Sequence, residues 1–233
     1  MSAAPEVSVI VPVRNGARSL PALLDSLEAQ TLPRERFEIV VVDNASADAT
    51  ARLAARPGVT VVSEPVANRS RARNRGAASA RARLYAFTDA DCVVEAQWLA
   101  ALLACAPSAP LVAGEVTLRV RQPPNTIERF ERLWRFDQGT WVREQGWAAT
   151  ANLLVDATAF GAVGGFDETW RHIGEDVDFC LRARAAGYGL GFCPGARVAH
   201  HGEHDLRPFL RRFFLHGYSA NQAHYRLGVG ARA

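Results

Sequence analysis

The sequence predicts an α/β fold, in which a mostly parallel sheet is flanked by helices within a single domain. Short apolar runs rich in β-branched residues alternate with segments of helical periodicity, which is the pattern of parallel strands joined by crossover helices. Polar residues, several of them acidic, follow these runs directly. The 233 residues suit one such domain with a sizeable core. In open parallel sheets ligands bind at the carboxyl ends of the strands, so the pattern also predicts where a site lies.

The first half of the chain alternates regularly between strands and helices. Residues 7–13 are almost continuously apolar and predict a buried strand. Ser19 offers an N-cap for a helix in which leucines recur at helical spacing. Two further helices, rich in alanine and arginine, follow the second and third strands. The further strands are predicted at residues 37–42, 59–62 and 84–88.

The second half is less regular. Pro123 and Pro124 break its first strand, and Gly187 closes its last helix. No repeat, linker or low-complexity tract divides the chain. The elements predicted here are strands at residues 111–120 and 188–192 and helices at residues 127–134 and 176–186.

Composition excludes several classes of protein. The formal net charge is only +3, and no basic stripe is interleaved with aromatic residues, so a nucleic-acid partner is not expected. No apolar run approaches the roughly 18–20 residues that span a bilayer, and no signal peptide is visible, so we expect a cytoplasmic protein. The cysteines lie far apart without a CxxC pair and are expected to be reduced thiols. They are Cys92, Cys105, Cys180 and Cys193.

Acidic residues follow two of the predicted strands. Asp89 and Asp91 come two residues apart at a strand end, where burying both unpaired would cost several kcal/mol per ion. A divalent cation, Mg²⁺ or Mn²⁺, removes that cost and can bridge a diphosphate; the alternative is a solvated turn. Asp43 ends another strand and either caps a turn or accepts a hydrogen bond from a nucleobase or ribose. The glycine-rich motif of dehydrogenases is absent after the first strand, where residues 12–16 read PVRNG.

Two more groups suggest chemistry in the second half. Glu175 and Asp176 open a predicted helix, either because acids complement the helix dipole or because one is a general base for an acceptor hydroxyl. His200 and His201, with His204 nearby, follow an apolar segment. Histidines at a strand end are structural or, in a chain with a candidate metal site, ligands.

The order of these motifs resembles that of family 2 glycosyltransferases. The resemblance covers about residues 7–202 and implies a GT-A fold. It also implies an inverting hexosyltransferase that uses a divalent cation and a nucleotide-diphosphate sugar. Where this family often has a glycine before the ARN segment, Asn68 stands here, and we expect it to adopt the left-handed conformation instead. The matching segments are VPVRNG (11–16), VVDNASAD (41–48), ARNRG (72–76), TDAD (88–91), GGFDE (164–168) and GEDVD (174–178).

The resemblance also implies roles for individual residues. Asp176 is expected to be the catalytic base. Asp91 and His200 are the expected metal ligands, with His201 as the alternative histidine. The residues expected at the donor are Pro12, Val13, Arg14, Asp43, Arg73, Asp89, Ala90 and Asp91. Those expected at the acceptor are Asn152, Gly165, Phe166 and Glu175, in a cleft also bordered by Asp167.

The predicted domain then divides into a donor half (1–121), an acceptor and catalytic half (122–204) and a C-terminal helix and tail (205–233). UDP-, GDP- and TDP-sugars remain open as donors, and the acceptor is not identified by the sequence, so that a small carrier, a lipid and a peptide all remain open. A sugar-1-phosphate nucleotidyltransferase would need a glycine-rich loop after the first strand and a catalytic lysine, and this chain has no lysine. A non-catalytic nucleotide-sugar binder would be expected to have lost Asp91 or Asp176, and both are present.

The C-terminal segment is strongly amphipathic, with apolar residues on one helical face and basic residues on the other. It either packs on the domain or rests on anionic lipid at the inner face of the membrane, bringing the site to a lipid-linked acceptor. The apolar residues are Leu206, Phe209, Leu210, Phe213 and Phe214, and the basic ones are Arg207, Arg211, Arg212 and His216.

Overall fold

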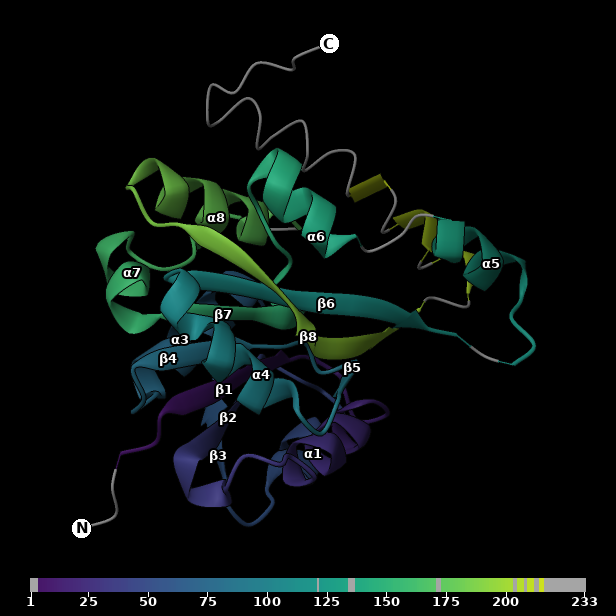
Figure 1. The fold of residues 1–233 in the computed structure, drawn as a ribbon. Coiled ribbons are helices and arrows are strands. Elements are labelled where there is room, and N and C mark those ends of the chain that lie inside the picture. Colours follow the sequence, from purple (N-terminus) through teal and green to yellow (C-terminus); the bar gives the residue numbers. More distant parts are fainter. Residues whose placement is uncertain are drawn as a thin grey trace.

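The computed structural model describes residues 4–120, 122–133, 137–170, 173–202, 205–207, 209–211 and 214–215. These residues form one eight-stranded sheet in the order β3-β2-β1-β4-β7-β6-β8-β5, with helices on both faces (Figure 1). The strands are β1 (Val7–Val13), β2 (Phe37–Asp43), β3 (Val59–Ser63), β4 (Leu84–Phe87), β5 (Cys92–Val94), β6 (Leu111–Arg119), β7 (Leu153–Asp156) and β8 (Leu190–His201). The α-helices are α1 (Leu20–Glu28), α2 (Thr50–Ala54), α3 (Arg69–Ser79), α4 (Trp98–Cys105), α5 (Thr126–Leu133), α6 (Gln138–Thr140), α7 (Ala157–Ala162) and α8 (Glu175–Ala185). Short helical turns are η1 (Arg34–Arg36), η2 (Ala106–Ser108), η3 (Trp141–Gln145) and η4 (Thr150–Asn152).

The predicted α/β class is confirmed, and the sheet is mostly parallel. Strands β3, β2, β1 and β4 run parallel, as do β6 and β8. Strands β5 and β7 are antiparallel to their neighbours, and the sequence did not predict either of them. The predicted strand at 188–192 is the beginning of a much longer β8.

Alternation along β1 explains its continuous apolar sequence. Val7, Val9 and Val11 face the core that includes the leucines of α1, whereas Ile10 belongs to a second core that includes Phe87 and the aromatic residues of α7 and α8. Both faces of the strand are therefore covered, as parallel sheets require. Ser8, also fully buried, is satisfied because its hydroxyl donates to Glu38 Oε1 at 2.6 Å.

Strand β8 changes register beside β6 between Gly114 and Glu115. Asn152 holds this bulge, because its Nδ2 donates to the carbonyl oxygens of Glu115 (2.9 Å) and Ala196 (2.8 Å). The Nε1 of Trp98 in turn donates to Asn152 Oδ1 at 2.8 Å. A Cβ on residue 114 would collide with the Asn152 amide, so glycine is required there. Bulges re-aim the strand that follows, and here that is the stretch ending in His200 and His201.

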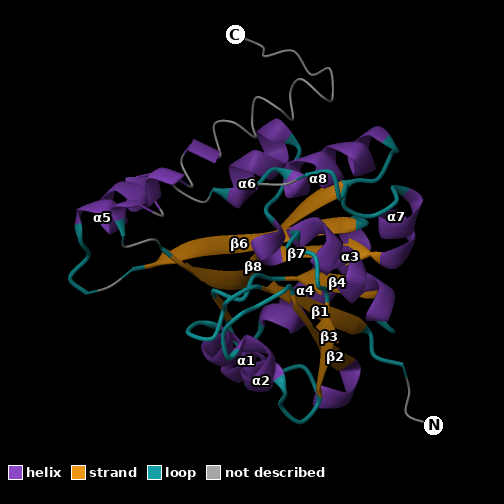
Figure 2. Cartoon of the chain, turned by 180° about the vertical axis from the view of Figure 1, so that it is seen from behind, coloured by secondary structure: helices purple, strands orange, loops and turns teal. Residues whose placement is uncertain are grey.

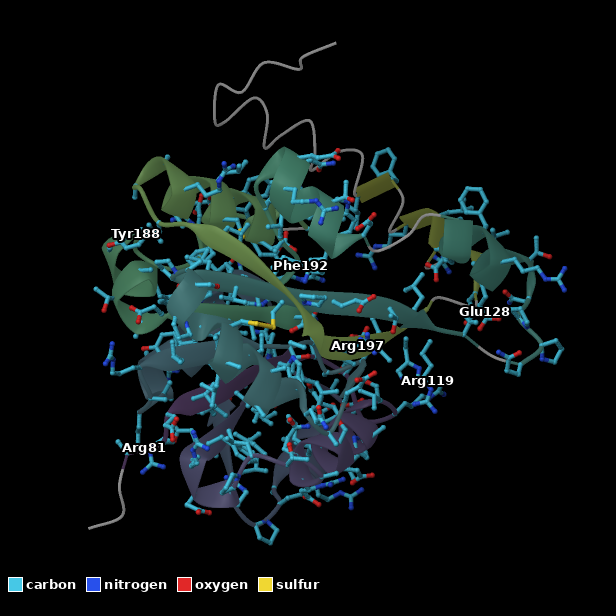
Figure 3. The ribbon with its side chains drawn as sticks, viewed as in Figure 1. Arg81, Arg119, Glu128, Tyr188, Phe192 and Arg197 are labelled. Atoms are coloured by element: carbon cyan, nitrogen blue, oxygen red, sulfur yellow. A yellow bond between two sulfur atoms is a disulfide. The ribbon has the colours of Figure 1, made fainter. Side chains whose placement is uncertain are left out.

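Three local expectations are corrected by the structure. A disulfide joins Cys105 of α4 to Cys193 of β8, so only Cys92 and Cys180 are free thiols (Figure 3). Ser19 stands at the N-cap position of α1, but its side chain makes no capping hydrogen bond. Asn68 has φ −153°, which is extended rather than left-handed, and its side chain instead caps α3 by accepting from the Arg71 amide.

Among the described residues, no helix is long and apolar enough to cross a membrane.

The distal ends of β6 and β8 form a ribbon that projects, with α5 near its tip, beyond the helices that flank the rest of the sheet (Figures 1 and 2). Arg119 and Glu128 lie on this projecting part (Figure 3). The described part of the predicted C-terminal helix is helical at residues 206–207, 209–211 and 214–215. The predicted contributions of His204, Arg212, Phe213 and His216 lie outside the described residues.

Candidate functional site

The carboxyl ends of β1 and β2 lie side by side and present the first part of the site. Val13 pairs with Asp43 at the last position of the two strands, while Arg14 just beyond is exposed. One carboxylate oxygen of Asp43, Oδ1, is buried and has no hydrogen-bond partner among the described residues. An unpaired buried acceptor at a strand end is costly, which fits a position completed by a ligand donor.

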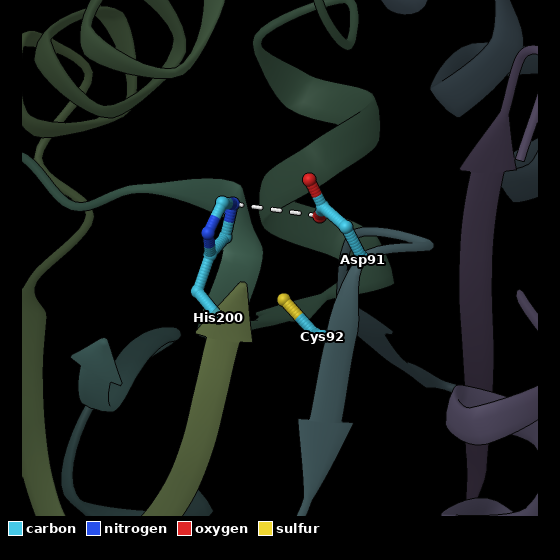
Figure 4. Close-up of side chains that lie close together, drawn as sticks. All are labelled: Asp91, Cys92 and His200. Atoms are coloured by element: carbon cyan, nitrogen blue, oxygen red, sulfur yellow. Dashed lines mark ion pairs between the residues drawn. The ribbon is translucent and has the colours of Figure 1, made fainter. Parts of the chain in front are cut away.

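Asp91 and His200 meet at the next part of the site (Figure 4). Asp91 follows β4, and His200 lies near the end of β8 directly opposite Cys92 of β5. His200 Nε2 lies 3.4 Å from Asp91 Oδ1, and its Nδ1 lies 2.8 Å from the carbonyl oxygen of His201. With the proton on Nδ1, Nε2 points a lone pair toward the carboxylate, as a metal ligand would. The side chain of His201 is exposed, and its backbone amide donates to the Asp91 carbonyl at 3.0 Å.

The donor atoms of this pair fit a divalent cation. Asp91 O, His200 N and the Sγ of Cys92 all lie within 4.8 Å of one another. Burial, with the nearby carboxylates of Asp89 and Asp91, raises the pKa of the Cys92 thiol well above its usual value, so the sulfur stays protonated. A carboxylate and an imidazole remain, which suit a divalent ion that completes its shell with phosphate or water oxygens.

Arg73 joins the donor half to the second half of the chain. Its side chain is only 4% exposed, and it donates from Nη2 to Asp89 Oδ1 at 2.9 Å and from Nη1 to Glu175 Oε1 at 2.7 Å. Burial alone would raise the pKa of Asp89, but the Arg73 guanidinium, with smaller contributions from His200 and Arg69, outweighs it and lowers that pKa. Asp89 is therefore an anion near neutral pH.

Helix α3 brings Arg73 to this position because it lies unusually close to the sheet. A Cβ on Gly76 would lie 2.5 Å from Ile10 Cγ2 and 3.1 Å from Val42 Cγ2, so only glycine allows this approach. The N-cap Asn68 also donates to the carbonyl oxygens of Glu168 (2.9 Å) and Trp170 (3.2 Å), which fixes the GGFDE segment against α3.

Asp176 stands in the first turn of α8, which begins after Gly174 in the left-handed region (φ 112°). Burial and the adjacent charge of Glu175 raise the pKa of Asp176 to about 7, against the opposing attraction of Arg73. Its Oδ1 accepts from the Val177 amide at 2.9 Å. A carboxyl group with a pKa near neutrality suits proton transfer, because both protonation states are accessible at working pH.

Three of the residues expected at the acceptor have buried side chains. Asn152 is fully buried in the β8 bulge, Phe166 is 1% exposed and Glu175 is 2% exposed. Asn152 and Phe166, which were expected to border the acceptor cleft, therefore present almost no side-chain surface to it. Arg182 holds the neighbouring loop, since its guanidinium donates to the carbonyl oxygens of Val163 (2.7 Å) and Gly165 (2.8 Å).

The role of Asn74 in holding the GGFDE segment in place was not predicted from the sequence. Asn74 Nδ2 donates to the Phe166 carbonyl and its Oδ1 accepts from the Phe166 amide, both at 2.9 Å. Asn74 lies in the ARNRG motif, so the motif pointed to the residue but not to its partner 92 positions away.

Comparison with known proteins gives two family matches. Residues 8–150 match the model described as glycosyl transferase family 2, and residues 86–229 match the one described as glycosyl transferase family group 2. Together the matched segments include each residue of the site described above.

The chain is similar to several curated proteins. It is 34% identical over 230 residues to the pre-mycofactocin glycosyltransferase of Mycobacterium tuberculosis, covering 92% of this chain and 47% of that protein. It is 32% identical over 220 residues to glycosyltransferase AglE of Haloferax volcanii, covering 89% and 69%. Over 85 residues it is 42% identical to N-acetylglucosaminyl-diphospho-decaprenol L-rhamnosyltransferase of M. tuberculosis, covering 36% and 26%. The chain thus spans about half the length of the first of these relatives.

Solved structures share the fold at low sequence identity. The mannosyltransferase PcManGT from Pyrobaculum calidifontis, in complex with GDP-Man and Mn²⁺, superposes with a TM-score of 0.73 at 22% identity, over 100% of this chain and 66% of that one. S. aureus TarS in complex with UDP gives 0.68 at 18% identity, over 84% and 60%. The GT-A fold expected from the motifs is therefore confirmed.

Proposed function

Because the chain belongs to glycosyl transferase family 2, we propose that it transfers a sugar from a nucleotide-diphosphate sugar to an acceptor hydroxyl, with inversion at the anomeric carbon. One observation carries this proposal. The Asp91–His200 pair and the Arg73-bridged carboxylates Asp89 and Glu175 gather beside Asp176, whose pKa is about 7. A site for a cation and a base for a hydroxyl are the two requirements of such a transfer.

Asp91 and His200 would hold the cation, which is Mn²⁺ or Mg²⁺. The mixed oxygen and nitrogen donors favour Mn²⁺, because Mg²⁺ strongly prefers oxygen ligands. When bound, the cation stabilises the negative charge that builds on the departing diphosphate. Asp89, anionic and turned toward Arg73, would accept a hydrogen bond from the ribose or help to neutralise the same ion.

The donor would lie along the carboxyl ends of β1 and β2. Asp43 Oδ1, buried without a partner among the described residues, would accept a hydrogen bond from the nucleobase or ribose. Pro12, Val13 and Arg14 would border the nucleotide, and Ala90 would lie beside the diphosphate. PcManGT and TarS bind GDP-Man and UDP respectively, so a purine and a pyrimidine nucleotide both remain candidates here.

Asp176 would remove the proton from the attacking hydroxyl. With a pKa of about 7 it is partly ionised at neutral pH, and its carboxylate form can accept the proton of the hydroxyl, which becomes more acidic as the new bond forms. Attack by the activated hydroxyl on the face opposite the departing diphosphate inverts the anomeric centre. The loop that contains Gly165 and the first turn of α8, which begins at Glu175, would border the acceptor mainly through their backbone, because both residues are buried.

A thermal-shift panel tests the donor. At a hundredfold excess over its Kd, a ligand that binds only the folded state adds about 2.7 kcal/mol of stability, roughly a 5–10 °C rise in Tm for a chain of this size. We expect one of UDP-, GDP- or TDP-sugar to give this rise with Mn²⁺ and little without it. The matched control is the same nucleotide with excess chelator. No rise with any nucleotide, with or without metal, would contradict the proposed function.

The exposed face of the C-terminal segment would bring the enzyme to a lipid-linked acceptor. Leu206, Leu210 and Phe214 recur every four residues and are 59%, 55% and 74% exposed. Phe209, by contrast, packs edge-on against Phe130 of α5, with ring centroids 5.7 Å apart. One side of the segment therefore packs on the protein and another presents apolar surface. One relative is named for a diphospho-decaprenol acceptor, which supports a lipid-linked substrate here.

We therefore expect salt-sensitive binding to anionic vesicles. Arginine near the headgroups contributes about 1 kcal/mol each, and this attraction weakens as salt screens it. In a co-sedimentation assay, the wild-type protein should bind vesicles that contain phosphatidylserine at low salt and should not bind neutral vesicles. The Arg207→Ala/Arg211→Ala variant should lose this binding, whereas Arg81→Ala, on the far side of the molecule, should keep it. Equal retention by both variants, or no binding at any salt, would assign the segment a purely structural role.

A further inference from the structure

We propose, taking the transfer reaction above as the premise, that Arg73 is a positioning residue that sets the orientation of the base Asp176 and does not bind the donor nucleotide. The resemblance to known enzymes implies that Arg73 lies at the base or diphosphate. The geometry points to a different role, because both terminal nitrogens of its guanidinium are already engaged by carboxylates from two separate parts of the chain.

Arg73 offers almost no accessible surface to a phosphate. The side chain is 4% exposed, and Nε is buried without a partner among the described residues. Nη1 and Nη2 each carry a second N–H group, but a phosphate could reach these groups only if the surrounding chain moved aside. Pulling the guanidinium away from Glu175 and Asp89 would leave both carboxylates without their partner, which is strongly unfavourable.

Glu175 depends on arginine for its position. Its side chain is 3% exposed, and Oε1 receives Arg73 Nη1 at 2.7 Å, with Arg69 Nε farther away at 3.8 Å. Its other oxygen, Oε2, is buried and has no partner among the described residues. Because Glu175 immediately precedes Asp176 in the first turn of α8, holding Glu175 fixes the direction in which the Asp176 side chain leaves the helix.

A second contact path links Arg73 to the same helix. The guanidinium lies over the ring of Phe166, 5.6 Å from its centroid. Phe166 packs against Phe179 of α8, with ring centroids 4.6 Å apart. Arg73 therefore contacts α8 at its first turn through Glu175 and one turn further along through two aromatic rings. Two contacts along one helix restrain its rotation as well as its distance.

The other end of the bridge is Asp89, two residues before the metal-ligand Asp91. The planar guanidinium of Arg73 thus fixes the position of α8, which carries Asp176, relative to the loop that carries Asp89 and Asp91. Only arginine offers two parallel sets of donors for this purpose, because lysine is a single point charge. A displacement of about 1 Å in a reacting group can cost about 10²-fold in rate, so loss of the guanidinium should slow the chemistry.

The test separates turnover from donor affinity. The probe is the nucleotide sugar that gives the largest thermal shift; its affinity is measured by calorimetry with Mn²⁺, and kcat is measured as release of nucleoside diphosphate. For Arg73→Gln we expect kcat to fall by about 10²-fold while the Kd for the donor stays at the wild-type value. Arg73→Lys, which can reach one carboxylate at a time, should recover part of the loss. Arg75→Gln, an exposed arginine two residues along the same helix, is the matched control and should behave as wild type.

A double variant covers the case in which Arg73→Gln folds poorly. Arg73→Gln/Glu175→Gln removes the carboxylate charge left unpaired, so it should regain the Tm lost by the single variant while kcat stays low. Wild-type kcat in the double variant, or a weakened donor Kd with unchanged kcat in any Arg73 variant, would overturn the proposal and return Arg73 to the donor site. If the wild-type protein itself released no nucleoside diphosphate, the transfer reaction would fail first.

Discussion

Replacing Asp176 by asparagine is expected to lower turnover by about 10²- to 10⁴-fold, the usual contribution of a positioned general base. The amide keeps the shape of the side chain but cannot accept the proton of the attacking hydroxyl. Donor and Mn²⁺ binding should persist, because Asp43, Asp91 and His200 are unchanged. Release of nucleoside diphosphate measures turnover, and calorimetry measures binding.

The pH dependence gives an independent check on the same residue. With a pKa of about 7, Asp176 of the free enzyme is mostly a carboxylate above that pH, so the wild-type kcat/KM should rise through pH 7 and then level off. The Asp176→Asn variant should lack this rise. The free energy of unfolding should change in the opposite sense. Because the pKa of Asp176 is higher in the folded protein than in the unfolded chain, where it is near 4, the folded protein should lose stability as the pH rises from about 4 to about 7. The Asp176→Asn variant should not show this loss.

Asp156→Asn is the control for the change of a carboxylate to an amide. Asp156 caps α7 by accepting from the Thr158 amide at 2.7 Å, and asparagine caps helices equally well. It should leave turnover and the pH profile unaltered. Wild-type turnover together with weakened donor binding in Asp176→Asn would instead place Asp176 in the donor site.

Changing Asp91 to asparagine should abolish turnover together with the metal-dependent part of donor stabilisation. The carboxylate is the charged ligand of the proposed cation, and a neutral amide cannot replace its charge. His200→Ala should be milder, raising the Mn²⁺ concentration needed for half-maximal activity, with partial rescue at excess Mn²⁺. Activity as a function of added Mn²⁺, with the paramagnetic signal of free Mn²⁺ as a direct binding measure, distinguishes the two effects.

His201→Ala is the natural comparison for the histidine. Its side chain is exposed and its contact with Asp91 is through the backbone, so the Mn²⁺ requirement should be unchanged. A shift of that requirement in His201→Ala and not in His200→Ala would reassign the ligand. Full activity of the wild type in excess chelator would contradict the metal-dependent mechanism altogether.

The strands that build the donor half could be predicted because each is a continuous apolar run between turn residues. β1 has the bounds expected, and β2 and β3 extend one residue further. β5 could not be predicted, since three residues are too few to show a period, and β7 could not because it continues into α7 with no glycine or proline between them. α4 was also missed, because its sequence is almost wholly apolar and has no polar face to reveal a helical period.

Contacts between distant residues explain the remaining errors. The cysteines that pair are 88 positions apart, and no local spacing marks them. Arg73 and Glu175 are separated by 102 positions, so the motifs indicated both residues but not that they pair. Asn68 illustrates a different difficulty: asparagine is favoured both in the left-handed region and at N-caps, and only the backbone conformation decides between them.

The strand order has a consequence for how the protein behaves in concentrated solution. The two outermost strands are β3 and β5, which are only five and three residues long. An outer strand exposes unpaired backbone groups that another chain can hydrogen-bond, and natural sheets limit this hazard by keeping such strands short. The long strands of this chain, β6 and β8, are interior in the strand order and pair with each other, although β7 covers only residues 111–113 of β6 and β5 only residues 198–200 of β8. The two ends of the sheet therefore offer a neighbouring molecule very little backbone on which to polymerise.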